Sequence, residues 1–395
     1  MNQFLLFISL VFTLSVFGQK GQKPDAYAKT ITAADLKKHL YIVAGAEMEG
    51  REATSEGERK AATYIENEFK RIGLQPGNKG SFRQYFPVYR DSLTRSVLRV
   101  GEQTFLTDKD FNANLNNITA TQAFSEAVYM SPSVPIDSIN KMELAGKLIL
   151  TQGVAIGRSE ALRSKGVAAV LTVSSIYPRA KPMSAAGSLT MQFFRKFLGA
   201  QQFTISEEVA KAIIGSGYDS VKAASMPLIV AANVQLEVQK TTSTLQSSNV
   251  LGMIPGKDLA NEYLFITAHY DHEGKRGDSV IYYGADDDGS GTVSVIELAE
   301  AFAKAYREGR GPRRSIVFMT VSGEEKGLWG SAYYGANPIF PLAQTTADLN
   351  IDMIGRIDPK RKIGDSTNYV YVVGDDKLSS DLRTISETQN KKYTK

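Results

Sequence analysis

The sequence contains no cysteine among its 395 residues. This absence excludes disulfide bonds, thiolate nucleophiles and a lipid anchor on cysteine. Histidine is also scarce, so a site built on imidazole must use His39, His269 or His272. Acidic and basic residues are nearly balanced, 42 against 46, and no basic block is interleaved with aromatic residues. This balance predicts a protein that does not bind nucleic acid.

Several common catalytic signatures are absent as well. The sequence has no His-Glu-x-x-His motif, because Arg276 stands where the second histidine would be. It has no Gly-x-Ser-x-Gly elbow and no Walker or dinucleotide-binding loop. These absences exclude the corresponding single-zinc peptidase, serine hydrolase and nucleotide-binding signatures.

Only one long apolar run is present, from Phe4 to Gly18. It is short for a bilayer span, which takes about 20 residues, and its length is typical of a secretory signal. We therefore predict a signal peptide over residues 1–19, a secreted or periplasmic protein, and no stable membrane insertion after cleavage. The alternative is an uncleaved membrane anchor. The absence of cysteine is compatible with an exported bacterial protein.

Most candidate metal-binding and proton-transfer residues lie between Phe265 and Asp352. Four apolar segments, at 263–268, 280–283, 315–321 and 347–351, each lead into polar groups. Groups that follow strand ends in an α/β sheet share one crevice, so these segments predict one site. The residues collected in this way are His269, Asp271, His272, Asp286, Asp287, Asp288, Glu324, Glu325 and Asp352.

So many carboxylates require a cation, because like charges a few ångströms apart raise one another's pKa and resist ionisation. Imidazole and carboxylate without thiolate suit zinc, or less specifically manganese or cobalt, and the excess of acid favours two ions over one. The alternative for Glu324 and Glu325 alone is a solvated loop. Helix capping explains one of the acids at 286–288, and we expect Asp286 and Asp288 to cap the helix or to orient a ligand.

With HYDH, GADDDGSG, SGEEKG and LNIDMIG in this order, the sequence resembles the M28 zinc peptidases, which include bacterial aminopeptidases, glutamate carboxypeptidase and glutaminyl cyclases. The resemblance implies that His269 and Asp352 bind one zinc and that Asp287 bridges two zinc ions. It further implies Glu325 as a ligand of the second zinc, Glu324 as the general base and Asp271 as the group that orients His269. A metal-activated water would then attack the peptide carbonyl.

The family pattern also implies a last histidine ligand downstream of Asp352, and this chain has no histidine there. We therefore expect a peptidase domain that is incomplete at its C-terminus and a second site without its usual histidine. His272 is expected to form hydrogen bonds or to line the pocket, with metal binding as the alternative. His39 is expected to be a helix residue with satisfied partners, and Arg51 to be structural.

The predicted fold is α/β, with a mixed central sheet flanked by helices. Helices are expected over 32–44, 56–72 and 292–310, and a strand over 84–89. Ala61, Ala62, Ile65, Phe69 and Ile72 recur at helical spacing and predict a buried face. Beyond Arg356, YVYVVGDD and the segment 378–392 predict a further strand and helix.

The expected domain organisation is a peptidase domain in two parts, residues 20–115 and 246–395, with an insertion at 116–245. The insertion resembles a protease-associated (PA) domain, because short β-like runs alternate with small helices and no acid cluster or histidine occurs. The resemblance predicts a secreted two-zinc aminopeptidase that acts on peptides. Alternatives are a carboxypeptidase, a glutaminyl cyclase, or an inactive truncated protein that binds metal or a partner.

Overall fold

The computed structural model describes residues 24–393 except 153–155, 176, 178–186, 193–198, 278 and 378. The predicted signal peptide lies outside the described residues. The chain forms two compact units, one from residues 1–86 and 247–395 (unit 1) and one from residues 87–246 (unit 2). Two long strands, β2 (Arg83–Val100) and β10 (Leu228–Ile254), contribute to both units.

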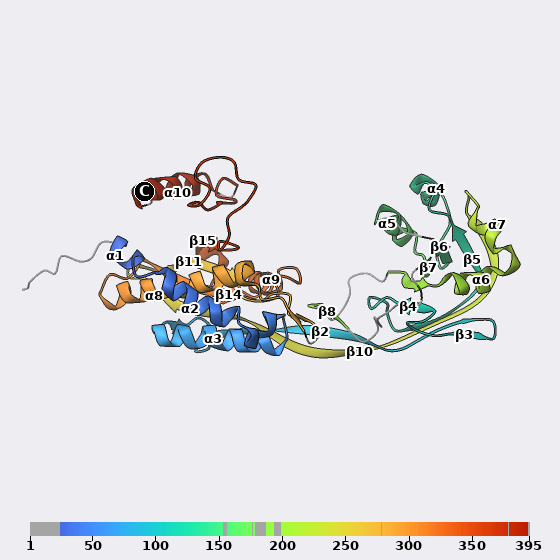
Figure 1. The fold of residues 1–395 in the computed structure, drawn as a ribbon, viewed down its shortest axis with the longest axis horizontal. Coiled ribbons are helices and arrows are strands. Elements are labelled where there is room, and N and C mark those ends of the chain that lie inside the picture. Colours follow the sequence, from blue (N-terminus) through green and yellow to red (C-terminus); the bar gives the residue numbers. More distant parts are fainter. Residues whose placement is uncertain are drawn as a thin grey trace, which may run out of the picture. The chain divides into compact units, whose positions relative to one another are not determined.

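The central sheet of unit 1 has the strand order β15–β11–β14–β10. Strand β11 (Leu259–His269) runs parallel to both β14 (Arg314–Val321) and β15 (Thr345–Asn350), whereas β10 is antiparallel to β14. The short β1 (Gln75–Pro76) also pairs with β10. The predicted mixed α/β sheet is therefore confirmed, and three of its strands end at the same edge (Figure 1).

Strand β14 is buried on both faces of this sheet. Side chains of a strand point alternately to opposite faces. In β14, Ile316 and Phe318 join one core cluster, whereas Val317 and Met319 join the cluster on the other face. The predicted apolar run at 315–321 thus forms a strand covered on two sides.

The first face is covered by α2 (Ala33–Val43), α3 (Glu56–Ile72) and α8 (Gly291–Arg307), with α1 (Pro24–Ala28) beside α8 (Figure 1). Helix α3 has the predicted bounds. It begins after Ser55, whose hydroxyl accepts a hydrogen bond from the Glu58 amide (3.1 Å), and ends at Gly73 with φ 88°. Its five predicted core residues are all buried. On the other face, α9 (Trp329–Ala336) contributes Tyr334 to the core.

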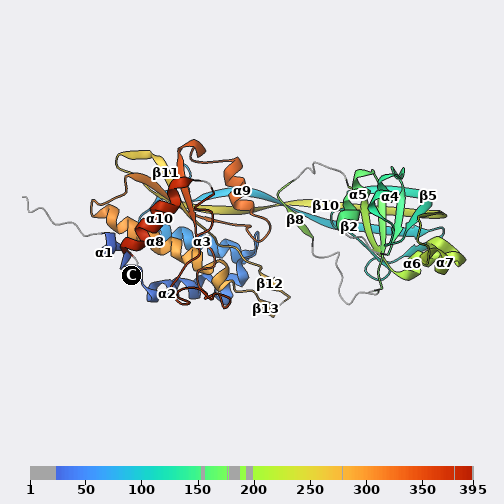
Figure 2. The same cartoon turned by 90° about the horizontal axis from the view of Figure 1, so that it is seen from above.

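Two expected strands are not found in the central sheet. Residues 280–283 supply only β13 (Val280–Ile281), which pairs with β12 (Lys275–Arg276) in a separate hairpin at the periphery of unit 1 (Figure 2). Val280 is exposed, so this apolar segment has no core to enter. The second wrong prediction is a strand at 369–373, where no described strand pairs with the chain and Val370–Val373 are exposed. A strand without a neighbour leaves its amides unpaired. The predicted helix beyond it is α10 (Ser380–Tyr393), which has no buried residue.

In unit 2, β5 (Ala120–Met130), β6 (Leu148–Thr151), β7 (Ala169–Val173) and β9 (Gln201–Ile205) are successive parallel neighbours, and β10 pairs antiparallel with β5. One core cluster of these strands includes residues of α4 (Ile136–Asn140) and α5 (Ile156–Ser164), and another includes residues of α6 (Glu207–Ile214), α7 (Tyr218–Lys222), β2 and β10. The remaining elements of the chain are short: η1 (Ala46–Arg51), β3 (Gln103–Phe105), β4 (Phe111–Ala113), β8 (Ser188–Thr190), η2 (Gly215–Gly217), η3 (Ala285–Ser290) and η4 (Leu342–Gln344).

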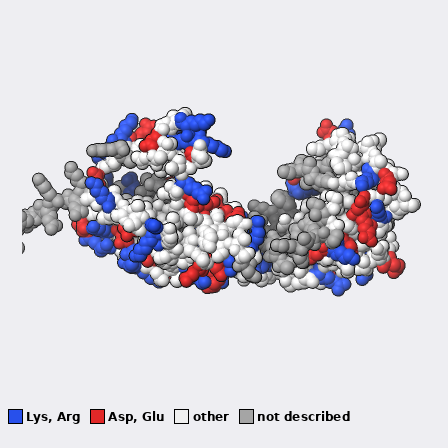
Figure 3. Space-filling model, viewed as in Figure 1, with Lys and Arg blue, Asp and Glu red and all other residues white. Residues whose placement is uncertain are grey.

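Charge is spread over the surface of each unit. Figure 3 shows Lys and Arg interspersed with Asp and Glu on the visible face. Among the described residues, no helix is both long and apolar enough to cross a bilayer.

Candidate metal centre

The predicted site residues meet at the edge where β11, β14 and β15 end. His269 is the last residue of β11 and lies in register with Val321, the last residue of β14. Asp352 follows β15, and Glu324 and Glu325 follow β14. Because parallel strands end on one side, residues far apart in the sequence converge here.

A first group of possible metal ligands consists of His269, Asp287 and Asp352, whose donor atoms lie within 4.8 Å of one another. The Nε2 atom of His269 is 3.1 Å from Asp287 Oδ1 and 3.9 Å from Asp352 Oδ1. Donors bound to one zinc at about 2.0–2.2 Å in tetrahedral geometry are separated by comparable distances. These three side chains are brought together as predicted.

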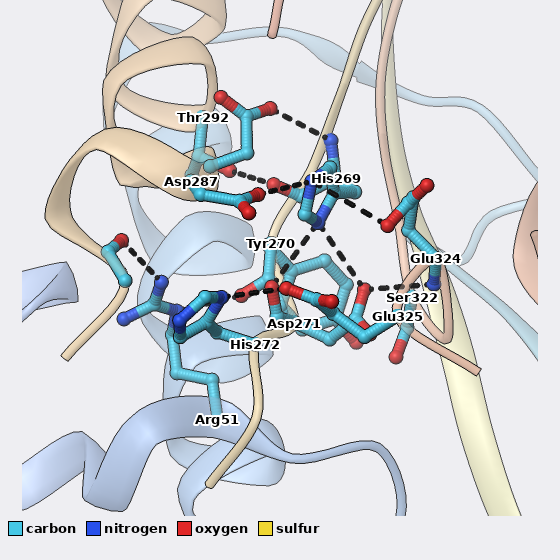
Figure 4. A network of polar contacts seen from close by, with 12 residues as sticks. Arg51, His269, Tyr270, Asp271, His272, Asp287, Thr292, Ser322, Glu324 and Glu325 are labelled. Carbon is cyan, nitrogen blue, oxygen red and sulfur yellow. Dashed lines mark hydrogen bonds and ion pairs between the residues drawn. The ribbon is translucent and has the colours of Figure 1, made fainter. Parts of the chain in front are cut away.

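His269 is held rigidly around this contact. Its Nδ1 lies 3.1 Å from the carbonyl oxygen of Asp271 and 3.6 Å from Asp271 Oδ1. Its amide donates to Asp288 Oδ2 (3.2 Å), and its carbonyl oxygen accepts from Thr292 Oγ1 (2.8 Å). With Nδ1 facing these oxygens, Nε2 is the nitrogen presented to a metal (Figure 4).

The acids at 286–288 differ in their surroundings. Asp287 is the one whose carboxylate reaches both candidate donor groups. Asp288 is fully buried, and it also accepts from the amides of Gly291 (2.8 Å) and Met353 (3.3 Å) at its Oδ1. Asp286 accepts from the Gly355 amide (2.8 Å). The two outer acids therefore hold the backbone around Asp287, as a cap or an orienting group would.

The turn after β14 places the two glutamates differently. Gly323 has φ 74°, a conformation that favours glycine, and the chain turns there before Glu324. The Glu324 amide donates to Asp271 Oδ1 (3.1 Å), and its Oε2 lies 3.9 Å from His269 Nε2. Glu324 therefore faces the first group, about a third exposed, whereas Glu325 faces His272.

A second group of possible ligands consists of His272, Asp287 and Glu325. His272 Nδ1 and Glu325 Oε1 are 2.6 Å apart, but they are not aligned for a hydrogen bond. Both atoms are buried and have no other hydrogen-bond partner among the described residues. The donor atoms of these three residues lie within 4.8 Å of one another, so the residues present suit a second ion that shares Asp287.

Comparison with known proteins identifies this part of the chain. Residues 249–395 match the model of peptidase family M28. This segment contains all six predicted site residues. The C-terminal part of this chain is therefore similar to the M28 family. A probable zinc metalloprotease of Pyricularia oryzae is 31% identical over 163 residues, which cover 40% of this chain and 30% of that protein.

Solved structures were compared as well. An aminopeptidase from Aneurinibacillus sp. strain AM-1 is 20% identical, with a TM-score of 0.49, over 84% of this chain and 72% of that chain. A zinc aminopeptidase from Bacillus subtilis is 17% identical, with a TM-score of 0.45, over 82% and 70% of the two chains. The chain spans less than a third of the length of the first curated relatives that it matches.

Residues 249–395 are similar to a peptidase family and to a probable zinc metalloprotease, and this similarity implies zinc. The ionisable groups of this region show why a cation is needed. Burial raises the pKa values of Glu324, Glu325 and Asp352, and neighbouring carboxylates raise them further. Burial raises the pKa of Asp288 to about 8. A bound cation would reverse this by stabilising the ionised forms.

Burial acts in the opposite direction on His269. Its desolvation alone would lower the imidazole pKa, but Asp271, Asp288 and Asp352 outweigh it and raise the pKa to about 9. The imidazole therefore carries a proton at neutral pH until a metal replaces it. Of these acids, Asp352 also belongs to the first group of possible ligands.

Sequence reasoning missed one buried residue that supports the M28 region from outside it. Glu58 in α3 accepts hydrogen bonds from Ser322 Oγ (2.6 Å), Ser247 Oγ and the Thr54 amide (2.6 Å). Arg51 donates only to backbone carbonyls. The only signal for Glu58 in the sequence was its place in the first turn of the amphipathic helix α3, whereas Arg51 had been predicted to be structural. His39 is a buried helix residue, as predicted, and contacts Tyr64 (2.6 Å) and Glu297 (3.2 Å).

Proposed function

We propose that this protein is a zinc-dependent exopeptidase, most specifically an aminopeptidase, that uses two zinc ions. The observation that carries the proposal is the pair of donor groups that share Asp287, with Glu324 beside them. His269, Asp287 and Asp352 would hold one ion. Asp287, Glu325 and His272 would hold the other, and His272 would supply the imidazole of the second site.

Zinc supplies a Lewis acid that makes water nucleophilic near neutral pH and polarises a peptide carbonyl. The chain's own residues would control the proton. Glu324 has an open carboxylate near Nε2 of His269, and burial raises its pKa, so it is suited to accept a proton from the attacking water. Asp271 holds His269 at Nδ1 and the Glu324 amide at Oδ1, so one carboxylate orients ligand and base together.

The charge around the site favours an amino terminus over a carboxyl terminus as the group that is recognised. The surrounding carboxyl groups outnumber the positive charges of two divalent ions and Arg51; they are Asp271, Asp286, Asp287, Asp288, Glu324, Glu325 and Asp352. A site with residual negative charge attracts the α-ammonium group of a peptide and repels an α-carboxylate. This supports aminopeptidase activity over carboxypeptidase activity.

We propose a supporting role for unit 2, as a PA-like module without catalytic groups. Among the described residues of 87–246, no cluster of histidine and acid could hold a metal. Export by the N-terminal apolar run remains part of this proposal.

The test is zinc stoichiometry of the purified chain, measured with hydrolysis of three substrate sets. These are free aminoacyl anilides, N-terminally blocked peptides and peptides that begin with glutamine. Two zinc ions per chain and cleavage of only the free aminoacyl anilides are expected. Cleavage of blocked peptides would indicate a carboxypeptidase, and cyclisation of glutamine a glutaminyl cyclase. No bound zinc would contradict the proposal.

The role of Glu324 has its own test. Glu324→Gln keeps size and polarity but removes the basic carboxylate, so hydrolysis should fall by about 10²- to 10⁴-fold while zinc content stays unchanged. The matched control is Glu273→Gln, in the same part of the chain but in neither donor group. It should alter neither property. Loss of zinc in Glu324→Gln would overturn the assignment as general base.

A further inference from the structure

Arg51 is a fully buried cation next to the metal centre. Its guanidinium makes four hydrogen bonds, all to backbone carbonyl oxygens. Nε donates to Tyr270 (2.7 Å), Nη1 to Val43 (2.7 Å) and Tyr283 (2.8 Å), and Nη2 to Gly284 (2.8 Å). No carboxylate is among these hydrogen-bond acceptors. Figure 4 shows Arg51 below the cluster of site residues.

The positions of these acceptors relate Arg51 to the ligands. Tyr270 lies between His269 and Asp271, so its carbonyl belongs to the loop after β11. Tyr283 and Gly284 belong to the loop that leads to Asp287. Val43 is the last residue of α2. One planar guanidinium thus joins the two loops that carry His269 and Asp287, and its fixed geometry sets the spacing between them.

The segment around Arg51 fits these loops closely. The carbonyl oxygen of Arg51 accepts from the His272 amide (3.3 Å), and that of Gly50 accepts from the Gly274 amide (3.0 Å). A Cβ atom at Gly50 would come within 2.4 Å of Gly274 O and 2.5 Å of Tyr282 O, so this close approach requires glycine. Arg51 itself has φ 53°, an unfavourable conformation for a residue with a side chain. The contacts with the loops hold it there.

The positive charge of Arg51 also interacts with the carboxylates of the site. Burial lowers its pKa to about 10, against the opposing effect of Asp271, Asp288 and Asp287, so the group stays cationic at neutral pH. Lysine could supply the charge, but it has one nitrogen and cannot reach four carbonyls in different directions.

We propose that Arg51 is a positioning residue of the metal centre, which fixes the distance between the His269 loop and the Asp287 loop. This inference rests on the proposed function, because the two loops matter as carriers of metal ligands. Arg51 touches neither substrate nor metal in this account. It acts through the backbone of Tyr270 and Gly284.

The test compares Arg51→Lys and Arg51→Met with matched substitutions of another buried arginine. Arg83 is also in unit 1, and its side chain donates to Glu66 (2.6 Å), Ser248 (3.1 Å) and Thr63 (3.2 Å), none of which lies in a ligand loop. Cobalt(II) is titrated into each metal-free protein, and its visible absorption spectrum reports the coordination geometry. Thermal unfolding of each metal-free variant reports stability separately.

Both Arg51 variants should bind cobalt about 10- to 100-fold more weakly, as when other orienting partners are lost, and with an altered spectrum. Arg83→Lys and Arg83→Met should keep the affinity and spectrum of the unsubstituted protein, even where they unfold at a lower temperature. Unchanged binding in Arg51→Lys and Arg51→Met would overturn the inference. An equal loss in the Arg83 variants, or failure of Arg51→Lys to fold, would overturn it in favour of a general structural role.

The same titration separates this inference from the proposed function. If the unsubstituted protein binds no cobalt or zinc, the proposed function fails first, and the role of Arg51 fails with it. If it binds metal and the Arg51 variants bind equally well, only the positioning role is wrong.

Discussion

The two donor groups of the metal centre share Asp287 but differ in how firmly they are held. In the first group, the amide, carbonyl and Nδ1 of His269 all have partners, and only Nε2 faces the site. In the second group, the His272 amide donates to the Arg51 carbonyl oxygen (3.3 Å), and Nδ1 of its ring lies 2.6 Å from Glu325 Oε1. Its Nδ1 and Glu325 Oε1 are buried without a hydrogen bond.

This difference affects how much conformational entropy each ligand loses when metal binds. A ligand that its neighbours already orient loses little entropy when metal binds, whereas a loosely held one must be ordered by the metal itself. We therefore expect the His269 group to bind its ion first and more tightly. The His272 group would fill second.

The largest effect should follow from the residue common to both groups. Asp287→Asn replaces a shared carboxylate by an amide, which cannot bridge two cations with full negative charge. Zinc content should fall to below one ion per chain, and hydrolysis should be lost. Metal analysis after dialysis provides the measurement, with Asp286→Asn as the control because Asp286 accepts from the Gly355 amide and belongs to neither group. Retention of both ions would show that Asp287 does not bridge.

Removal of one imidazole at a time should assign each zinc-binding event to one of the two donor groups. His269→Ala should abolish the tighter of two binding events in a zinc titration, and His272→Ala the weaker one. His39→Ala is the matched control, because His39 is a buried histidine of unit 1 that contacts Tyr64 and Glu297. It should lower stability and leave both binding events intact. If His272→Ala also leaves two events, the second group is wrong.

Much of this arrangement could be predicted from the sequence, because neighbouring parallel strands end at the same edge of a sheet. His269, Glu324, Glu325 and Asp352 each follow an apolar run that does become a strand, and their meeting needs only a shared strand direction. Helix α3 was predicted to the residue, because its apolar residues recur at helical spacing and Gly73 marks its end. Local signals of this kind are carried by the residues themselves.

Other features depend on tertiary contacts that leave no pattern in the amino-acid sequence. The run at 280–283 is apolar enough for the central sheet, yet it forms only the exposed hairpin strand β13. Arg51 binds carbonyl oxygens, which every residue possesses, so no residue type signals its partners. The approach of His272 to Glu325 depends on two turns, and turn geometry is not readable from ligand spacing.

A smaller effect should distinguish orientation from ligation. Asp271→Asn leaves every proposed ligand in place but weakens the negative charge beside His269 Nδ1, which lies 3.6 Å from Asp271 Oδ1. Affinity for the tighter ion should fall by about 10- to 100-fold, as for other orienting partners of metal ligands. The weaker event should change less, because Asp271 belongs to the first group's surroundings. A competition titration with a chelator measures both. Equal weakening of the two events would contradict the proposed division.

The smallest expected effect is the pH dependence of cobalt affinity. It is measured on His272→Ala, which retains only the first donor group. The acids around His269 raise its pKa to about 9, so metal must displace a proton from the imidazole below that pH. Cobalt affinity should therefore rise by at least about tenfold per pH unit towards pH 9 and then level off, since the imidazole releases one proton and the acids with raised pKa values can release more. The metal-free protein should show the opposite trend. A raised histidine pKa stabilises the fold fully below the unfolded pKa of about 6.5, and this contribution is lost as pH rises towards 9. Parallel trends would mean that His269 carries no proton in the metal-free protein.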